Sequence, residues 1–487
     1  MRRLFEIDLK DYEGCSKVFR RPSVRGIIFK GNKIAMVYAT NEKYCKFPGG
    51  GMHDDEDKKE ALLREVKEEV GLDVIPESIR EYGSVLRRQR SDRDPDTIFE
   101  QENFYFLCRT GEMAGKQNLD AYEAEAGFQL SYMDIDDAIR INIEYRSECF
   151  FNEVMIDRER RVLELIKASR YDVVALGELL IDFTESGKSA DGMKLFEQNP
   201  GGAPANLLTA LSHSGYKTAF IGKVGDDMHG RFLIETLEKE GIETGSVIKD
   251  PEQFTTLAFV GLDQDGERTF SFARKPGADT MLRSDELNRE MLSMCKIFHF
   301  GSLSLTDEPA RSATLEAVQI AKSSGAVISY DPNYRASLWP DEKTAADMMR
   351  SAVPLADVLK VSGEESLLLT GCSEIEDAAD CLLSMGPKFV AVTLGSDGVL
   401  IARKDRKDRI GAFQVKSIDT TGAGDSFWGG FLSCWLSYGV GIDEMNWEDL
   451  QNCARTGSAF AALCVQKRGG IPSVPSKEEV EQFLKNR

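Results

Sequence analysis

The chain has few histidines, no closely spaced cysteines and no long apolar run. Its 487 residues include four histidines and no H-E-x-x-H pair, so a histidine-built metal centre is not expected. The ten cysteines are scattered without any C-x-x-C spacing, which argues against a disulfide framework or a zinc ribbon. No segment has the length and apolarity of a signal-peptide core or a membrane span. These absences predict a cytoplasmic protein with reduced thiols and no membrane partner.

Positive charge is also in short supply. Lys and Arg total 61 against 81 Asp and Glu, a formal net charge of −20, which is the wrong sign for a protein that grips a nucleic-acid backbone. Phosphorylated ligands would then be held by a metal ion or by local hydrogen-bond donors. With 42% hydrophobic and 29% charged residues, the chain has a globular profile and is long enough for two to four domains.

The clearest break in the chain lies near residues 166–172, where a charged helical segment, 152–170, runs into a buried-strand pattern at 173–177. We therefore expect one domain at 1–168 and a second at 171–487. In the first, the pattern predicts a hairpin of 24–29 with 33–38, a helix at 55–70 and a strand at 103–108. In the second, short apolar strands alternate with helices, which predicts a mostly parallel sheet. Its predicted strands are 218–221, 297–300, 326–330, 358–361 and 389–393.

An acidic helix dominates the first domain. Glu65, Glu68 and Glu69 fall within roughly 100° of one helix face, while aliphatic residues gather on another. Three like charges at this spacing repel one another, and Mg²⁺ or Mn²⁺ would neutralise them. Such an ion can bridge pyrophosphate oxygens and activate water for hydrolysis of a phosphoanhydride. The alternative is that the run is a solvated helix face.

Residues 50–72 resemble the Nudix box, G-x5-E-x7-R-E-U-x-E-E-x-G-U with U aliphatic, and meet every fixed position. The resemblance implies a Nudix α/β/α sandwich with a mixed sheet that hydrolyses a nucleoside diphosphate linked to a group X. The implied metal ligands are Glu65, Glu68 and Glu69, the last two also being catalytic; Arg64 would orient a carboxylate, and Gly50 would start the loop that shapes the site. A further base is expected at Glu100 or Glu102. The box does not encode X.

A second phosphate-binding element is expected at residues 415–436. An alternating strand pattern ending at Asp419 precedes T-T-G-A-G-D at 420–425 and an apolar helix at 427–436. The first amides of a helix lack intrahelical partners and carry the positive end of its dipole, so they hold phosphate well. Phe427 stands where a third glycine would be needed, which excludes a P-loop or Rossmann motif. Asp425 is either a carboxylate stabilised by the dipole or a general base beside the anion hole.

Three further segments favour the general base. The stretch 419–427 together with G-G-A-P-A-N at 201–206, F-I-G-K-V-G-D-D at 220–227 and V-T-L-G-S-D-G at 392–398 resembles PfkB-type sugar kinases of the ribokinase-like superfamily. The likeness extends from residue 172 to the C-terminus. It implies a ribokinase-like αβα sandwich with a mostly parallel sheet and a small β lid, with ATP as co-substrate, Mg²⁺, K⁺ beside the anion hole, and a possible homodimer through the lid.

The resemblance also implies roles residue by residue. Asp425 would be the catalytic base, with the amides of Gly422, Ala423, Gly424 and Asp425 as the anion hole. Substrate-binding residues would be Asp182, Gly201, Gly202, Asn206, Arg274, Asn333 and Arg335, with Asp279 beside them. Nucleotide-binding residues would be Thr393, Gly395, Gly398 and Ser458, and metal-binding residues Glu365 and Asp419. In two places the chain departs from the family: its N-x-x-E element reads S-G-E-E at 362–365, and Ser458 stands near the adenine where Asn is usual.

The segments G-E-L-L-I-D-F, G-G-A-P-A-N, D-P-N-Y-R and D-T-T-G-A-G-D-S-F-W-G-G-F-L are most similar to fructokinases. They imply ATP-dependent phosphorylation of fructose at its primary 6-hydroxyl, with 2-keto-3-deoxygluconate, ribose or a nucleoside as alternatives. Two hypotheses stay open for the whole chain. It is either a bifunctional hydrolase and kinase, or a kinase regulated by a Nudix-fold sensor that binds a nucleotide sugar without cleaving it.

Overall fold

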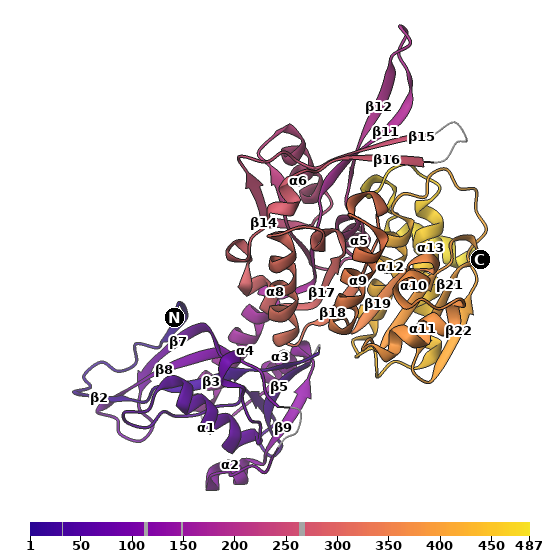
Figure 1. Cartoon of the computed structure of the whole chain (residues 1–487). Helices are drawn as coiled ribbons and strands as arrows, with labels where there is room; N and C mark the ends of the chain where they lie inside the picture. The colour runs from indigo at the N-terminus through magenta and orange to yellow at the C-terminus, as the bar shows by residue number, and fades with distance from the viewer. Residues whose placement is uncertain (32, 112–114, 148–149, 263–267) are drawn as a thin grey trace. The chain divides into compact units, whose positions relative to one another are not determined.

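The computed structural model describes residues 1–31, 33–111, 115–147, 150–262 and 268–487. Asn32 of the predicted hairpin and Cys149 lie outside these residues. The chain divides into two compact units (Figure 1). The N-terminal unit comprises 1–170 with 323–325, and the C-terminal unit comprises 171–322 with 326–487. Within the described ranges, no helix is both long and apolar enough to cross a membrane.

The N-terminal unit contains two sheets. The five-stranded sheet has the order β1 (Arg3–Asp8), β7 (Arg80–Arg90), β8 (Thr97–Leu107) and β2 (Lys17–Arg20), with β3 (Ser23–Ile27) also paired to β8. The smaller sheet contains β4 (Phe29–Lys30), β5 (Lys33–Ala39), β6 (Tyr44–Lys46) and β9 (Phe128–Met133). The helices are α1 (Lys58–Val70), α2 (Ala121–Ala126), α3 (Ile135–Glu144) and α4 (Phe150–Ser169). Since β7 and β8 are antiparallel while β3 and β8 are parallel, the expected mixed sheet is confirmed.

Helix α1 starts where its capping groups place it. Asp57 accepts hydrogen bonds from the amides of the first turn, Glu60 closes the capping box, and Gly71 ends the helix at φ 71°. These caps stabilise the termini and explain why the helix begins at Lys58 rather than at the predicted residue 55. Its aliphatic residues enter a core with Val24 and Phe106, so α1 covers one face of the strands.

The predicted hairpin at 24–38 is wrong in its first strand. Residues 23–27 form β3, which pairs with β8 in the larger sheet. The antiparallel pairing of this segment with β5 is confined to the short strand β4. The apolar alternation therefore continued across two strands that belong to different sheets. Sequence periodicity could not separate them because both are buried on the side that faces the same core.

The C-terminal unit is built on a nine-stranded sheet that is parallel from β14 to β20 and antiparallel beyond it. In spatial order its strands are β14 (Glu243–Asp250), β13 (Thr218–Gly225), β10 (Tyr171–Leu176), β17 (Cys295–Gly301), β18 (Val327–Asp331), β19 (Val358–Ser362), β20 (Phe389–Thr393), β21 (Val399–Arg403) and β22 (Arg406–Ile410). The five strands predicted for this half lie within β13, β17, β18, β19 and β20, apart from Ala326.

Helices cover both faces of this sheet. Alternate residues of β10 point to opposite sides, Val173 into one apolar core and Val174 into the other. The first core is shared with α5 (Ala203–His213), α6 (Met228–Lys239), α12 (Ala423–Tyr438) and α13 (Trp447–Cys464). The second is shared with α8 (Ala310–Ser323), α9 (Glu342–Ala352), α10 (Gly363–Thr370) and α11 (Ile375–Ser384). The remaining helices are α7 (Arg289–Ser293) and α14 (Lys477–Lys485). This layering confirms the αβα sandwich.

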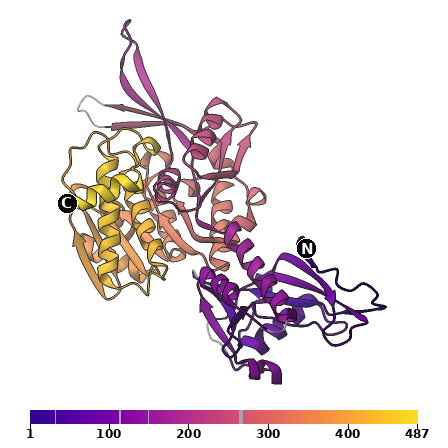
Figure 2. The ribbon, with the colours of Figure 1, turned by 180° about the vertical axis from the view of Figure 1, so that it is seen from behind.

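A separate four-stranded sheet forms the expected small β lid. Its order is β12 (Lys194–Gly201), β11 (Leu180–Lys188), β15 (Leu257–Leu262) and β16 (Arg268–Ala273). In both views, β11 and β12 extend away from the C-terminal unit as a long ribbon (Figures 1 and 2). The lid begins directly after β10, so the start of β11 lies beside the large sheet.

One predicted element is missing from the C-terminal unit. Residues 411–419 contain no strand, since β22 ends at Ile410 and the chain then runs irregularly to the start of α12. The alternation at 415–419 instead reflects residues that line a cavity, such as Val415 and Ser417. The predicted helix exists and is longer than 427–436 at both ends.

Candidate active sites

A polar cavity of about 400 Å³ lies at the start of α12. Its lining includes most of the predicted substrate and catalytic residues, namely Asp182, Gly202, Asn206, Asn333, Arg335, Gly422, Gly424 and Asp425. They come from the lid, α5, the segment after β18 and α12. Segments about 240 residues apart in the chain thus meet at the carboxyl ends of parallel strands, where open α/β sheets bind ligands.

Asp425 lies at the floor of this cavity, 8% exposed. Its Oδ2 accepts a hydrogen bond of 2.8 Å from Asn206 Nδ2, and its Oδ1 accepts one of 3.3 Å from Asn333 Nδ2. Burial, followed by the negative charge of Asp331, raises the pKa of Asp425 from 3.8 to about 6. A buried carboxylate with fixed orientation and a pKa near neutrality is suited to accept a proton from a hydroxyl group.

The first turn of α12 supplies amide donors beside Asp425. Gly422 caps the helix at φ 76°, a conformation that favours glycine. The Ala423 amide donates to the Thr420 carbonyl at 3.2 Å, so it is not available to an anion, contrary to the expectation for Ala423. The amides of Gly424 and Asp425 have no protein acceptor among the described residues, and they form the open part of the anion hole.

Lys360, which sequence reasoning missed, brings positive charge to the same turn. A Cβ on Gly424 would lie 2.8 Å from Lys360 Nζ, and that ammonium group donates to Asp331 Oδ2 at 2.8 Å. Although burial lowers it, the Asp331 carboxylate raises the pKa of Lys360 on balance, so the side chain stays charged. A lysine inside the otherwise apolar strand 358–361 was the sequence signal that could have identified it.

The lid side of the cavity carries two carboxyl groups. Burial raises the pKa of Asp182 to about 6, and Arg335 opposes that rise. Glu178, also missed, accepts a hydrogen bond from the Ala203 amide at 2.9 Å, and burial raises its pKa to about 7. A Cβ at Gly201 would lie 2.7 Å from Asp182 Oδ2, so this glycine makes room for the carboxylate without lining the cavity itself.

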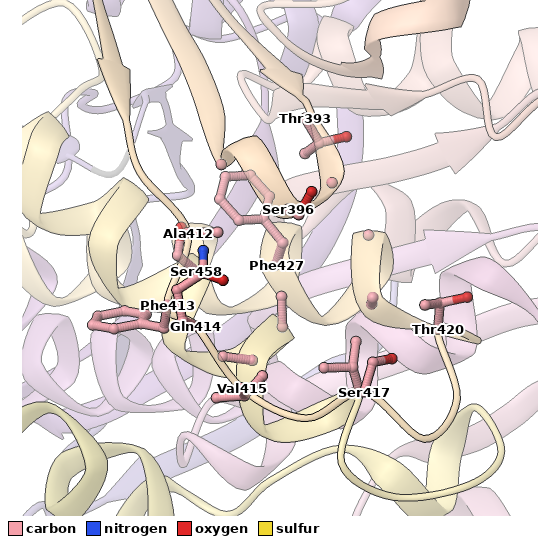
Figure 3. Close-up of a pocket in the computed structure, with 17 residues that line it drawn as sticks. Thr393, Ser396, Ala412, Phe413, Gln414, Val415, Ser417, Thr420, Phe427 and Ser458 are labelled. Carbon is pink, nitrogen blue, oxygen red and sulfur yellow. The ribbon is translucent and has the colours of Figure 1, made fainter.

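A second cavity of about 350 Å³ begins on the other side of the same helix start. All four predicted nucleotide-binding residues line it (Figure 3): Thr393, Gly395, Gly398 and Ser458. Thr420 and Gly424 line both cavities, so the anion hole separates a largely apolar pocket from a polar one. That arrangement suits a nucleotide whose terminal phosphate reaches toward an acceptor.

The predicted metal-binding residues of this unit are both engaged with backbone amides. Glu365 accepts from Tyr334 N at 2.6 Å and from Ser362 N at 2.7 Å, at the edge of a third cavity of about 370 Å³. Asp419 accepts from Thr421 N at 2.8 Å and from Gly469 N at 3.2 Å. The latter bond places Asp419 beside the turn at 469–473, where the cation site was expected.

Arg274 is not among the described residues that line the substrate cavity. Its guanidinium is buried, donates to Asp279 Oδ2 at 2.8 Å, and also donates to the Leu303 carbonyl and the Thr306 hydroxyl. With its nitrogens committed in this way, the side chain supports the segment under the lid. Its predicted contact with substrate has no counterpart in this arrangement.

In the N-terminal unit, Arg64 organises part of the acidic helix. It binds Glu56 through two hydrogen bonds of 2.8 Å, and this interaction lowers the pKa of Glu56 to about 2. Arg64 Nη1 also donates to Glu65 at 2.7 Å and to Glu68 at 3.1 Å. Glu65 and Glu68 therefore converge on one nitrogen atom, and the Glu65 carboxylate lies directly over Gly50.

Glu69 lies apart from the other two glutamates. It is 1% exposed, and its Oε1 is 2.5 Å from Lys46 Nζ while its Oε2 accepts from the Gly49 amide at 2.8 Å. Among the residues that the structure describes, no three His, Cys, Asp or Glu side chains are grouped as a metal site. The expected convergence of three carboxylates is therefore not what the structure shows, because Lys46 already neutralises the third.

The two candidates for an additional base are engaged elsewhere. Hydrogen bonds from Arg88 and Arg20 lower the pKa of Glu100, and Glu102 accepts from Arg3 at 2.9 Å and from Ser84 at 3.0 Å. Both carboxylates therefore belong to ion pairs or hydrogen bonds of the five-stranded sheet.

Comparison with known proteins identifies both units. Residues 170–477 match the pfkB family carbohydrate kinase, and residues 19–152 match the NUDIX domain. The probable fructokinase-2 of Arabidopsis thaliana is 43% identical over 316 residues, which cover 64% of this chain and 95% of that protein.

Solved structures agree with this assignment. A fructokinase double mutant from Vibrio cholerae O395, in a form bound to fructose, ADP and potassium ion, has 32% identity and a TM-score of 0.59, covering 65% of this chain and 99% of its own. The aminoimidazole riboside kinase of Salmonella enterica, complexed with its riboside and an ATP analog, has 27% identity and a TM-score of 0.56, covering 64% and 99%.

Proposed function

Because this chain belongs to the pfkB family of carbohydrate kinases and carries a NUDIX domain before the kinase, we propose that its C-terminal unit phosphorylates fructose with ATP, at the primary 6-hydroxyl. The similarity of the fructokinases supports the choice of sugar, and the riboside kinase represents the alternative acceptors. The observation that carries the reaction type is the position of Asp425, buried beside two open amides where two cavities meet.

The chemistry follows from that geometry. The sugar occupies the polar cavity, where Asn206 and Asn333 hold the Asp425 carboxylate in one orientation. Asp425 takes the proton of the attacking hydroxyl group as the O–P bond forms and the bond to the ADP leaving group breaks. The amides of Gly424 and Asp425, with Lys360 behind them, stabilise the negative charge on the phosphoryl group.

In the third cavity, Glu365 suits a divalent cation that is held through water molecules. Both oxygens of Glu365 are occupied by amides, so this residue would orient water molecules around an ion rather than bind the ion itself. Mg²⁺, when bound to ATP, neutralises phosphate charge. A monovalent ion near Asp419 remains a prediction, for which the adjoining turn at 469–473 provides the support.

The sugar assignment is tested by ADP release over a panel of fructose, ribose, 2-keto-3-deoxygluconate and nucleosides at fixed ATP. We expect the highest kcat/KM with fructose. Product analysis then separates the 6-phosphate from the 1-phosphate. Absence of turnover with any ketose, together with turnover of another acceptor, would remove fructose as the substrate while leaving the phosphotransfer intact.

For the N-terminal unit we propose metal-dependent hydrolysis of a nucleoside diphosphate linked to a second group, with Glu65 and Glu68 as the two protein ligands. Mg²⁺ in phosphate-handling enzymes is commonly held by one or two carboxylates plus substrate oxygens. Glu65 and Glu68 fit this pattern because both accept a hydrogen bond from Arg64 Nη1, so their carboxylates lie close together. Glu69 does not fit as a third ligand while Lys46 holds it. When bound, the ion would activate water for attack on the diphosphate.

The sensor hypothesis is the second candidate, favoured by the pairing of Glu69 with Lys46. Hydrolysis of ADP-ribose and a panel of nucleotide sugars with Mg²⁺ separates the two, by comparing the wild type with Glu68→Gln. Loss of product formation in the variant supports hydrolysis at this site. Equal rates of hydrolysis in the two proteins would exclude hydrolysis at this metal site. Ligand binding with no hydrolysis in either protein would support a sensor.

The lid is the proposed surface of a homodimer. Its outer strand β12 pairs on one side only among the strands that the structure describes. It exposes Leu195 and Phe196, and Met193 beside them is 69% exposed. Exposed strand edges with apolar side chains favour pairing with another chain. Sedimentation equilibrium checks this point: Phe196→Glu should shift a dimer to a monomer, whereas an unchanged mass would exclude the lid as the interface.

A further inference from the structure

A buried polar layer separates α4 from the five-stranded sheet of the N-terminal unit. On β3 and β8, residues at odd positions face α4, as their contacts show. Tyr105 Oη donates to Glu159 at 3.2 Å, and Arg158 Nη1 donates to Gln101 Oε1 at 3.0 Å. Arg25 belongs to the same layer, 4.0 Å from the Glu159 carboxylate. Such layers are normally fully hydrogen-bonded, because a buried polar group without a partner is destabilising.

Arg25 breaks that rule. It is 5% exposed, and its Nε and Nη1 atoms have no hydrogen-bond partner among the described residues. The nearby Glu159 carboxylate acts on Arg25 as a charge at 4.0 Å but makes no hydrogen bond to it, and its Oε1 already accepts from Arg158 at 3.0 and 2.5 Å. Glu159 Oε2 accepts from the Phe47 amide at 2.9 Å. The guanidinium of Arg25 is therefore left with open donors.

Asn103 lies beside it in the same condition. It is fully buried, and both atoms of its amide group lack partners. It stands opposite Ser23 in the β3–β8 register, two residues before the rung of Arg25 and Tyr105. The neighbouring hydroxyl of Ser23 is engaged by Gln101. An open donor and an open acceptor thus lie on the same face of the sheet as Arg25, whose Nε and Nη1 make no hydrogen bond to the described residues.

The layer also contains more positive than negative charge. Arg25, Arg87 and Arg158 are buried in it with the carboxylate of Glu159. Glu69, the other buried carboxylate on which the charge of Arg25 acts, is already paired with Lys46. Arg87 is compensated by neutral groups, since it donates to Gln89 and to the Phe151 carbonyl. A buried positive charge that is only partly compensated is costly, and an anionic ligand would supply the missing counter-charge.

We propose that Arg25 and Asn103 form an oxyanion subsite that binds a phosphoryl group of the N-terminal unit's ligand, an inference that rests on the function proposed for that unit. A guanidinium fork matches phosphate geometry. The loop that opens the Nudix box runs along β3, since Val24 N donates to the Gly50 carbonyl at 2.9 Å and Gly26 N to the Pro48 carbonyl at 2.8 Å. Arg25 lies between these two contacts, next to the loop.

Calorimetric titration of the full chain with inorganic pyrophosphate in EDTA tests the subsite without metal. Arg25→Met should weaken binding at least tenfold, and Asn103→Leu should weaken it less. Any binding by the kinase unit is the same in each protein and cancels in the comparison. Arg87→Met is the matched control, since it removes an equally buried arginine whose donors are satisfied, and it should leave the affinity unchanged.

Thermal unfolding separates a binding role from a structural one. Without ligand, Arg25→Met should raise the melting temperature of the N-terminal unit by a few degrees, because a buried guanidinium with two unsatisfied nitrogen donors is removed. Arg87→Met should lower it, because satisfied hydrogen bonds are lost. Fructose phosphorylation should be unchanged in both. Wild-type affinity in Arg25→Met, or a fall in its melting temperature, would overturn the proposal.

The hydrolysis proposal can fail independently. Glu68→Gln should lose hydrolysis and keep the metal-free binding of pyrophosphate. If Glu68→Gln hydrolysed at the wild-type rate while Arg25→Met lost pyrophosphate binding, the metal ligands would be wrong and the subsite would stand. If pyrophosphate binding survived Arg25→Met, the subsite would be wrong whatever the hydrolysis rate.

Discussion

The two sites proposed to bind phosphate are built in opposite ways. At the start of α12, the amides of Gly424 and Asp425 are uncharged donors with no protein acceptor, so an incoming phosphate breaks no internal bond. On α1, the carboxylates of Glu65 and Glu68 share Arg64, and Glu69 is held by Lys46. Backbone dipoles can stay open at little cost, whereas a carboxylate cluster is neutralised by fixed cations until a metal competes for it.

The largest expected effect comes from removing the carboxylate of Asp425, the proposed base of the kinase unit. Asp425→Asn should reduce kcat by about 10²–10⁴ while the protein stays folded, because Asn206 Oδ1 has no partner and can accept from the new amide after a flip. Steady-state assays with fructose, with circular dichroism for the fold, measure this. The exposed Asp443→Asn is the matched control and should be fully active. A variant at position 425 with normal turnover would remove this residue from the mechanism.

The next effect concerns the buried Lys46–Glu69 ion pair of the N-terminal unit. Lys46→Met leaves Glu69 buried without its cation and should lower the free energy of unfolding by about 3–5 kcal/mol. The double variant Lys46→Met with Glu69→Gln should recover most of that loss, because no charge is then left unpaired. Urea unfolding followed in the N-terminal unit measures both. If the single variant were as stable as the wild type, Lys46 would not be the cation that neutralises Glu69.

A smaller effect is the pH dependence of phosphotransfer. The pKa of Asp425 is raised from 3.8 to about 6, so kcat/KM should fall about tenfold per pH unit below that value as the base is protonated. The same shift contributes stability below pH 3.8 that is lost as the pH rises through 6. Asp331→Asn should move the acidic limb to lower pH, because the Asp331 charge raises the pKa of Asp425. If the acidic limb of the pH profile did not move in this variant, the limb would be due to a group other than Asp425.

The smallest effect is expected at an exposed ion pair of the same unit as Lys46. Lys67 and Asp73 lie 2.6 Å apart with side chains more than 60% exposed. Asp73→Asn should change the free energy of unfolding by only about 0–1 kcal/mol, because solvent screens the pair. Urea unfolding of this variant beside Lys46→Met gives the contrast between screened and buried charge directly. Equal losses in the free energy of unfolding of the two variants would show that burial does not determine how much each ion pair contributes.

Sequence reasoning predicted most of the residues that line the kinase cavities, because these residues occur in contiguous motifs. The four predicted nucleotide-binding residues line one cavity, and Asp425 lies where the helix start was predicted. It missed Lys360 and Asp331, each a single charged residue within or at the end of a strand. Their proximity depends on neighbouring strands being adjacent in the sheet, which no local pattern encodes. The hydrogen-bond partners of Arg274 also lie on other segments, so its contact with substrate stays a prediction.

By itself, the sequence determined which chemical groups are present and how each helix begins. The caps of α1, the glycines before α12 and the alternation of strands with helices are local, so short-range sterics and hydrogen bonding specify them. Only the tertiary structure decided which of those groups are free. Lys46 pairs with Glu69, and two nitrogen donors of Arg25 stay without partners because its nearest carboxylate already accepts hydrogen bonds from another arginine. Pairing between distant charges depends on packing, and packing is a property of the whole unit.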